Sequence, residues 1–220
     1  MPFDGEALDD RVRKYDAIAE SYSSRYVDAE KIFSEQLSLI LGWGSPIRPG
    51  DSALEFGCAD GSLAMALARR GIKTRGVDFS PKMTEVAQKR ASEAGIIVEF
   101  VTGDVRKYFP NREFDVVIGL MWDFFSFAKP QRQVLRRVLG FTRRKIIVDV
   151  NLRRYPLQRA IDDIVSAGFR NVEWRPFFIP QKYRLGLFSG ALLRLCAATP
   201  LVRDMILRYK FSAVIKAEKP

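Results

Sequence analysis

The chain contains no histidine, so it lacks the side chain that most often serves as a general base near neutral pH. Histidine-dependent triads, HExxH zinc sites and facial-triad iron sites are therefore excluded. Only two cysteines occur among the 220 residues, Cys58 and Cys196, which also excludes a disulfide framework and a zinc ribbon. So few cysteines are typical of a protein from a reducing compartment.

Long apolar runs are also missing. The N-terminus is charged from Asp4 onward and has no apolar segment, so we expect no secretory signal peptide. The most apolar late window, residues 185–202, contains Arg194 and Pro200, which argues against a membrane-spanning helix. With 47% hydrophobic residues, the chain is expected to fold as one large domain, or as one domain with an added lobe. We expect a cytoplasmic protein.

Positive charge is concentrated in the C-terminal part of the chain. Residues 1–130 hold 17 basic and 20 acidic side chains, whereas residues 131–220 hold 19 basic and 6 acidic ones. Such an excess is typical of a solvated basic face, and it also fits an acidic substrate, an anionic membrane surface or nucleic acid. No RNA-recognition motif is visible, which argues against nucleic acid as a partner.

The distribution of apolar residues predicts an α/β fold. Residues 7–42 show helical spacing, with a break near 23–26, and a stretch rich in glycine and proline follows at 42–50. Strands and helices then alternate, which is typical of a parallel sheet covered on both faces. We predict strands over 52–56, 74–77, 96–101, 114–120, 145–150, 169–178 and 211–216. We predict helices over 63–70, 81–94, 132–139, 157–167 and, interrupted at Pro200, over 185–208.

A glycine-containing turn ends the first predicted strand and opens the next helix. The sequence there is Ala53-Leu-Glu-Phe-Gly-Cys-Ala-Asp-Gly61. Turns of this kind let a ligand approach the backbone closely. The pattern differs from the G-x-G-x-x-G of dinucleotide sites, because Ala59 and Ser62 stand where that motif has its second and third glycines.

This turn resembles the E-x-G-x-G-x-G motif of class I S-adenosylmethionine (SAM) dependent methyltransferases, with Ala59 in place of the middle glycine. The resemblance implies SAM as the cofactor and a Rossmann-like, seven-stranded, mostly parallel sheet with an antiparallel last strand. The resemblance covers residues 50–150 well. The predicted helix at 157–167 and strand at 211–216 fit the last elements of the family's fold. It assigns to the cofactor site the turn residues Glu55, Gly57, Cys58, Ala59 and Gly61.

Further motifs follow at the ends of the next two strands, where open α/β sheets bind ligands. In Gly76-Val-Asp-Phe-Ser80, the carboxylate of Asp78 is suited to accept both ribose hydroxyl protons. The resemblance assigns that role to Asp78 and places Phe79 beside the adenine. After the third strand, the resemblance assigns Asp104 to the adenine amino group and the backbone of Val105 to the ring.

The loop after the fourth strand contains the candidate catalytic residue. The resemblance places Leu120 in the region behind the transferred methyl group, and the Asn/Asp-Pro-Pro-Tyr signature of many amino-group methylases is absent. Without histidine, a base must be Asp, Glu, Tyr or Lys, and Asp123 is the best-placed candidate. A solvated loop carboxylate or a helix cap is the alternative interpretation of Asp123. Trp122 and the phenylalanines at 124, 125 and 127 either wall an acceptor pocket or belong to the core.

No metal site is expected. Metal-dependent O-methyltransferases need a cluster of Asp and Asn ligands after the fourth and fifth strands. Here only Asp123, Asp149 and Asn151 are nearby, and Asp149 stands within an apolar strand.

The N-terminal helices contain Tyr15-Asp-x-x-Ala-x-x-Tyr22, which resembles the lid segment of related small-molecule methyltransferases. The resemblance assigns Tyr15 and Tyr22 to a lid over SAM, and the planar guanidinium of Arg25 suits the methionine carboxylate. An ordinary amphipathic helix is the alternative. We therefore divide the chain into an N-terminal helical lid, 1–45, and a SAM-binding domain, 46–220, with a helical cap inserted at 180–210.

Three functions remain open at this point. The lid favours O- or C-methylation of a small-molecule acceptor. The alternative is a lipid or lipid-linked acceptor at a membrane surface, with peripheral membrane contact. It is suggested by the predicted helix at 185–208, which is apolar and has basic residues at intervals. The other explanation of this segment is a helix packed on the core. An RNA-binding methyltransferase or an inactive SAM-binding module is the third function. Basic residues near the entrance would favour an anionic acceptor, and the oligomeric state is not indicated.

Overall fold

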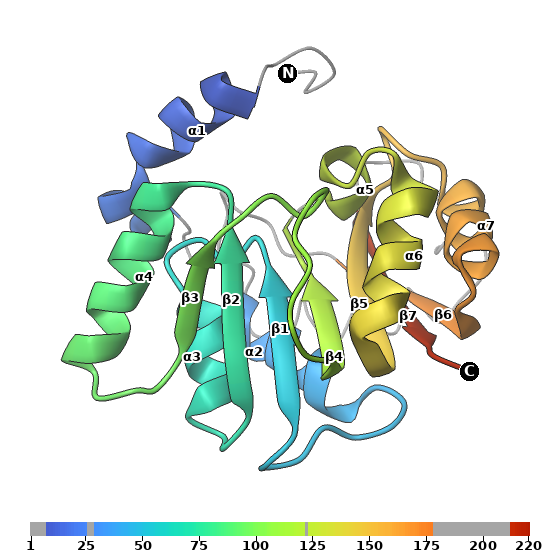
Figure 1. Ribbon diagram of the computed structural model, residues 1–220, viewed down its shortest axis with the longest axis horizontal. Helices are drawn as coiled ribbons and strands as arrows, with labels where there is room; N and C mark the ends of the chain where they lie inside the picture. Colours follow the sequence, from blue (N-terminus) through green and yellow to red (C-terminus); the bar gives the residue numbers. More distant parts are fainter. Residues whose placement is uncertain (1–7, 26–28, 122, 178–211) are drawn as a thin grey trace, which may run out of the picture.

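A seven-stranded sheet forms the centre of the computed structural model, which describes residues 8–25, 29–121, 123–177 and 212–220 (Figure 1). The strand order is β3-β2-β1-β4-β5-β7-β6. All neighbouring strands from β3 to β5 pair in parallel, whereas β7 pairs antiparallel with both β5 and β6. This topology confirms the predicted fold class. The strands are β1 (Ser52–Phe56), β2 (Lys73–Asp78), β3 (Glu99–Thr102), β4 (Phe114–Gly119), β5 (Thr142–Asn151), β6 (Arg170–Phe177) and β7 (Ser212–Glu218).

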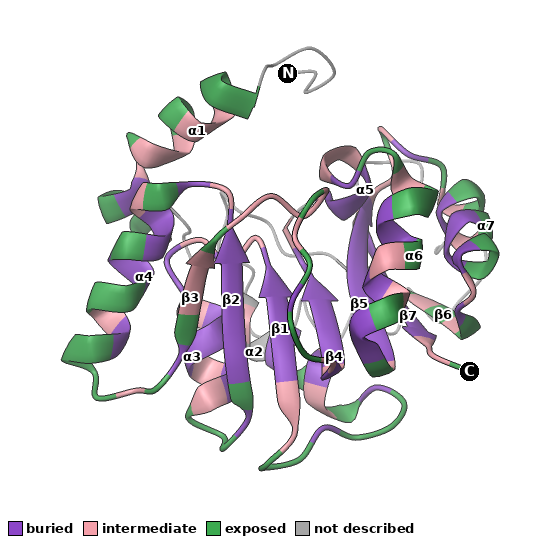
Figure 2. Cartoon of the chain, in the orientation of Figure 1, coloured by how far each residue is buried: buried purple, intermediate pink, exposed green. Residues whose placement is uncertain are grey.

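Helices cover both faces of the sheet. The helices α2 and α3 pack on one face around Ile40 and Leu67, and α6 and α7 pack on the other around Leu135 and Ile164. Figure 2 shows the central strands buried and the outer faces of α4, α6 and α7 exposed. Within the described ranges, no helix has the length and apolar character needed to cross a membrane. The helices are α1 (Leu8–Asp16), α2 (Ala29–Gly42), α3 (Ser62–Ala68), α4 (Pro81–Glu93), α5 (Phe124–Phe127), α6 (Gln131–Phe141) and α7 (Leu157–Ala167), with short 3₁₀ turns η1 (Ala19–Ser21) and η2 (Ser23–Arg25).

The start of α4 shows why local sequence predicts this fold well. Ser80 is the N-cap residue, and its hydroxyl accepts a hydrogen bond from the Met83 N–H at 3.1 Å, with proline in the first helical position. The same serine hydroxyl donates to the carboxylate of Asp16 at 2.5 Å, and that carboxylate also accepts from the Lys82 N–H. Asp16 therefore ties the end of α1 to the start of α4.

Three element predictions need correction. The third strand begins at Glu99 instead of residue 96, because the Ile96 N–H still bonds to the Ala91 carbonyl and closes the end of α4. The fifth strand begins at Thr142, immediately after α6 ends at Phe141. The short helix α5 was not predicted, because its four aromatic and small residues carry no helical periodicity. The predicted helix at 185–208 and cap at 180–210 lie outside the described residues.

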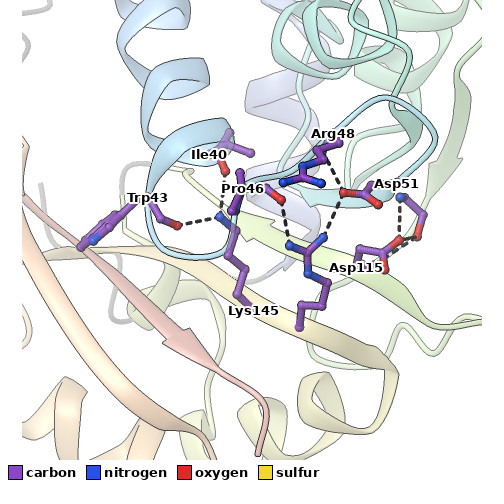
Figure 3. Close-up of polar contacts among 9 residues, drawn as sticks. Ile40, Trp43, Pro46, Arg48, Asp51, Asp115 and Lys145 are labelled. Atoms are coloured by element: carbon purple, nitrogen blue, oxygen red, sulfur yellow. Dashed lines mark hydrogen bonds and ion pairs between the residues drawn. The ribbon is translucent and has the colours of Figure 1, made fainter.

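A buried lysine anchors the C-terminal end of α2 (Figure 3). The Nζ atom of Lys145 donates to the carbonyl oxygens of Ile40 at 3.0 Å and Trp43 at 2.7 Å. Beside it, Arg144 donates to the Pro46 carbonyl and to Asp51. Carbonyls at a helix end have no partner within the helix, so a cationic donor stabilises them. Because Lys145 stands near the start of β5, α2 must end at the amino-terminal edge of the strands and begin near their carboxyl ends.

Replacing Lys145 with methionine should lower the free energy of unfolding by about 2–3 kcal/mol, because two buried carbonyls lose their donor while side-chain volume is kept. Burial, followed by the charges of Arg144 and Lys216, lowers the pKa of Lys145 to about 8 from its ordinary 10.5. Between these values the unfolded chain binds more protons than the folded chain, so this group makes stability rise with pH there.

Urea unfolding at several pH values checks this prediction. In Lys145→Met, the free energy of unfolding should increase less with pH than in the unmodified chain. Lys73→Met, at an exposed position, should show the same pH dependence as the unmodified chain. An unchanged free energy of unfolding in Lys145→Met would show that the two hydrogen bonds are dispensable.

Candidate active site

A cleft of about 670 Å³ opens at the carboxyl ends of β1, β2 and β4. Residues of α1 and α2 line it, together with Ile18 and Tyr22 on either side of η1. Figure 1 shows α1 and α5 above the arrowheads of the sheet. A cleft of this size at this edge is typical of small-molecule sites in open α/β folds. The sequence-predicted residues that line it are Tyr15, Tyr22, Glu55, Gly57, Cys58, Ala59, Asp78, Phe79, Asp104, Val105, Leu120 and Asp123.

One described residue of the predicted cofactor site, Gly61, does not line the cleft. It is the N-cap of α3 and has a φ of 77°. A Cβ atom there would lie 2.6 Å from the Phe100 ring and 2.9 Å from Ala87. Glycine at this position therefore allows close packing of helix against sheet. The side chain of Arg25 and all of Trp122 lie outside the described residues.

The turn after β1 brings backbone close to the neighbouring loops. Gly57 has a φ of 69°, and a Cβ atom on it would lie 2.7 Å from Met121, so only glycine fits. Its N–H donates to the Val77 carbonyl at 2.7 Å. Ala59, where the family motif has glycine, adopts a φ of 46° and donates its N–H to Asp78 at 3.0 Å. This hydrogen bond joins the first motif to the second and helps to hold alanine in a conformation that favours glycine.

Asp78 is buried at the end of β2, with both carboxylate oxygens held by backbone. Its Oδ1 accepts from the Ser80 N–H at 2.9 Å, and its Oδ2 accepts from the Ala59 N–H. Burial raises the pKa of Asp78 to about 6, although these N–H groups act in the opposite direction. Each oxygen keeps a further lone pair, so the carboxylate can accept both hydroxyl protons of a ribose.

Asp104 forms an ion pair with Arg106, which the sequence analysis missed. The guanidinium donates from Nε at 2.9 and 2.8 Å and from a terminal nitrogen at 2.5 Å, so both carboxylate oxygens are engaged. Burial acts to raise the pKa of Asp104, but Arg106 lowers it below the ordinary value. Both side chains line the cleft, so an adenine amino group would meet an ionised and firmly positioned carboxylate.

Aromatic rings connect the N-terminal helix with the strand-end loops. Tyr15 contacts the edge of Phe79 at a centroid distance of 5.3 Å, and Phe79 stacks with Phe127 of α5 at 6.2 Å. The guanidinium of Arg11 lies 5.0 Å from the centre of the Phe127 ring. These contacts connect α1 with the loop after β2 and with α5.

Asp123, Asn151 and Arg154 also line the cleft. Asp123 is only 2% exposed, and its Oδ2 accepts from the Ser126 hydroxyl and from Arg154 at 3.2 Å. Its Oδ1 is buried and has no hydrogen-bond partner among the described residues. No local signal in the sequence pointed to Arg154, because it follows β5, far along the chain from the recognised motifs. Asn151, which the sequence analysis considered only as a possible metal ligand, is the last residue of β5.

The aromatic residues that follow Asp123 in the sequence have two different environments. Phe124 and Phe125 are fully buried core residues, whereas Phe127 lines the cleft.

The Phe124 N–H donates to Asp149 at 2.9 Å. Burial, followed by the charge of Asp123, raises the pKa of Asp149 to about 8, so this carboxyl is mostly protonated at neutral pH. Asp149 does not line the cleft, so its carboxyl is not placed to bind a metal ion there.

The charges at the cleft suit a cationic cofactor. SAM has a sulfonium and an ammonium group, a ribose diol and an adenine, and the loops after β1, β2 and β3 offer acidic or backbone groups for each. Burial, followed by repulsion from Asp60 and Asp78, raises the pKa of Glu55 to about 8, so a nearby cation would be stabilising. The acidic lining residues are Glu55, Asp60, Asp78, Asp104 and Asp123, and the basic ones are Arg11, Lys14, Arg106 and Arg154.

Comparison with known proteins agrees with this geometry. Residues 53–145, from β1 into β5, match the family described as a methyltransferase domain, and a solved structure with the same fold contains bound SAM. Residues 53–145 of this chain therefore form a class I SAM-dependent methyltransferase domain. The predicted family and its cofactor are thereby confirmed.

The individual matches show how much of this chain resembles each known protein. Ribosomal protein L11 methyltransferase of Thermus thermophilus is 30% identical over 127 residues, which are 58% of this chain and 48% of that protein. The chain spans less than half of the length of the curated relatives it matches. The structure of the (4+2)-cyclase SpnF has a TM-score of 0.72 at 17% identity and covers 98% of this chain and 97% of its own.

Magnesium protoporphyrin IX methyltransferase from Synechocystis PCC 6803 with bound SAM has a TM-score of 0.62 at 17% identity. The match covers 98% of this chain and 87% of that one. At these identities the two structures show a shared fold. A cyclase and a methyltransferase both have it, so the fold alone does not select the reaction.

Replacing Asp78 with asparagine should weaken binding of S-adenosylhomocysteine (SAH) by about 1–3 kcal/mol near neutral pH, because the amide presents one acceptor oxygen to the diol instead of two. The unmodified chain should bind SAH less tightly as the pH falls through about 6, where protonation of Asp78 removes acceptor capacity. The asparagine variant should lack this decrease. Isothermal titration across that range gives the answer, and an identical pH dependence in both proteins would refute the ribose assignment.

Proposed function

We propose that this chain transfers a methyl group from SAM to a small-molecule acceptor, by O- or C-methylation. The observation that carries the proposal is the buried oxygen of Asp123, which lies at the cofactor cleft and has no partner among the described residues. We further propose that residues 1–45 act as a lid on a methyltransferase domain formed by residues 46–220.

The cofactor supplies an electrophilic methyl group, so the protein has to position the acceptor, exclude water and receive a proton. The loops after β1, β2 and β3 hold the adenosine part through Asp78 and Asp104. The α1 helix covers this part of the cleft, since Asp16 ties it to the start of α4 and Tyr15 contacts Phe79. The acceptor then occupies the end of the cleft near Asp123 and Phe127.

Asp123 is arranged to accept a proton. Ser126 and Arg154 hold Oδ2, which stabilises the carboxylate and orients it, while Oδ1 is left for a donor on the acceptor. A hydroxyl group or an acidic C–H can provide that donor. An ionised carboxylate on the acceptor has no proton to give and would be repelled, so the site favours hydroxyl or carbon methylation over methyl-ester formation.

The cover over the cleft supports a small acceptor. Leu8, Arg11, Ile18 and Tyr22 line the side opposite the strand ends, so the site is bounded on two sides. A macromolecular acceptor needs a surface that is open to a large partner. The relative named for ribosomal protein L11 shares less than half of its length with this chain, so its printed substrate does not identify the acceptor here.

Replacing Asp123 with asparagine should lower kcat by about 10²- to 10⁴-fold, because general-base assistance is lost. SAH affinity should stay within about twofold, since we place Asp123 at the acceptor end of the cleft. The test uses an acceptor found by screening the unmodified chain with SAM and a metabolite panel. Asp162→Asn, on an exposed position of α7, serves as the control. If Asp123→Asn keeps full kcat, Asp123 is not the base.

Methyl transfer should not require a metal ion. Among the described residues, no group of three or more His, Cys, Asp or Glu side chains is placed to hold one, and the cofactor methyl is already activated by its sulfonium. Turnover should therefore be the same after dialysis against EDTA and after addition of magnesium. A loss of activity with EDTA that magnesium restores would contradict this prediction.

A further inference from the structure

Asp163 of α7 is a buried carboxylate that lies outside the cleft. It is only 3% exposed and does not line the cleft. One of its oxygens accepts from Arg132 Nε of α6 at 2.5 Å, and the other accepts from the Tyr155 hydroxyl. Figure 1 shows α6 and α7 packed next to each other on one side of the sheet. A carboxylate that is buried and paired through both oxygens makes its surroundings rigid. Asp163 therefore fixes the position of Tyr155 relative to these two helices.

Tyr155 lies in the loop between β5 and α7 and is 8% exposed. Its ring stacks on Phe125 of α5 at a centroid distance of 5.1 Å, and the guanidinium of Arg159 lies 5.2 Å from the ring centre. Burial, followed by the hydrogen bond to Asp163, raises the pKa of Tyr155 to about 12, so the hydroxyl keeps its proton and stays a donor. Tyr155 thus connects α7 with α5, through its hydroxyl on one side and its ring on the other.

The loop that contains Tyr155 also presents Arg154 to Asp123. The N–H groups of Arg154 and Tyr155 both donate to the Asn151 carbonyl, at 2.9 and 3.0 Å. The Arg154 guanidinium donates to Asp123 at 3.2 Å. Residues 123–125 and 154–155 therefore meet through two neighbouring contacts, the ion pair and the stack of Tyr155 on Phe125. A long side chain such as arginine is placed precisely only where the backbone that carries it is held.

Asp123 stands at the start of α5, a helix of four residues that is too short to be stable by itself. The direction of its carboxylate therefore depends on contacts from outside the helix. We propose that Tyr155 and Asp163 are positioning residues for methyl transfer, which hold the loop of residues 151–155 so that Arg154 orients the Asp123 carboxylate. This inference rests on the proposed function, in which Asp123 accepts the proton. Neither Tyr155 nor Asp163 lines the cleft, so both act through Arg154.

Tyr155→Phe tests this role, because it removes the hydroxyl and keeps the stacked ring. With SAM and the acceptor found in the metabolite screen, kcat should fall by about 10- to 100-fold, since a small displacement of a catalytic group has an effect of this size. The affinity for SAH should stay within about twofold. Tyr108→Phe is the matched control. It also removes a hydroxyl that bonds to a neighbouring side chain, Arg75 at 3.1 Å, and it should leave kcat unchanged.

A double-mutant cycle separates positioning from general damage to the fold. In the Asp123→Asn background, Tyr155→Phe should change kcat by less than about twofold, because the group that it positions is already gone. An equal fall in both backgrounds, or an unchanged kcat in Tyr155→Phe alone, would overturn the positioning role. If Asp123→Asn itself keeps full kcat, the proposed base fails, which is a different result from a failure of Tyr155 alone.

Amide hydrogen exchange of the ligand-free chain reports on the loop without any acceptor. In Tyr155→Phe, the N–H groups of residues 154 and 155 should exchange about 2- to 10-fold faster, as expected when one hydrogen bond that holds the loop is lost. Asp163→Ala removes the other partner of this bond and should speed exchange at the same two positions. Unchanged exchange in both variants would show that the bond does not hold the loop, and the proposal would fail.

Discussion

One buried carboxylate, that of Asp78, connects the parts of the molecule that form the site. It accepts the N–H of Ala59 from the turn after β1 and the N–H of Ser80 from the start of α4. Ser80 in turn donates to Asp16 at the end of α1, and Asp16 accepts from Lys82. This network joins the glycine turn, the end of β2, the start of α4 and the N-terminal helix. These hydrogen bonds, most of them partly buried, couple the positions of the four elements to one another.

Four aspartates near the strand ends have the same chemical group and different environments. Backbone N–H groups hold Asp78, and a guanidinium holds both oxygens of Asp104. Asp123 is held through one oxygen only, and Asp149 is buried with a pKa of about 8. In the function proposed above, these environments divide the carboxyl groups between ligand binding, proton transfer and structure. Such a division would allow acid–base chemistry without histidine.

Much of the fold could be predicted from the sequence, because its signals are local. The alternation of strands and helices follows from the period of apolar residues, and Ser80 with Pro81 marks the start of α4 at the position found. The glycine requirement at Gly57 likewise follows from a turn of a few residues. The family resemblance added the antiparallel placement of the last strand, which no local pattern indicates. The residues of the site that stand in these motifs line one cleft because parallel strands end at the same edge.

The rest depended on which distant segments meet in three dimensions. Gln36 stands within an apolar stretch of a helix, and only the anchoring of α2 against β5 turns it toward the cleft. Arg154 bonds to Asp123, which lies 31 residues earlier in the sequence. Phe124 and Phe125 of α5 pack into the hydrophobic core. Gly61 carries a motif position, yet its neighbours Phe100 and Ala87 make it a packing residue. Local sequence encodes periodicity and turns, whereas a partner for a buried polar atom exists only after packing has brought the elements together.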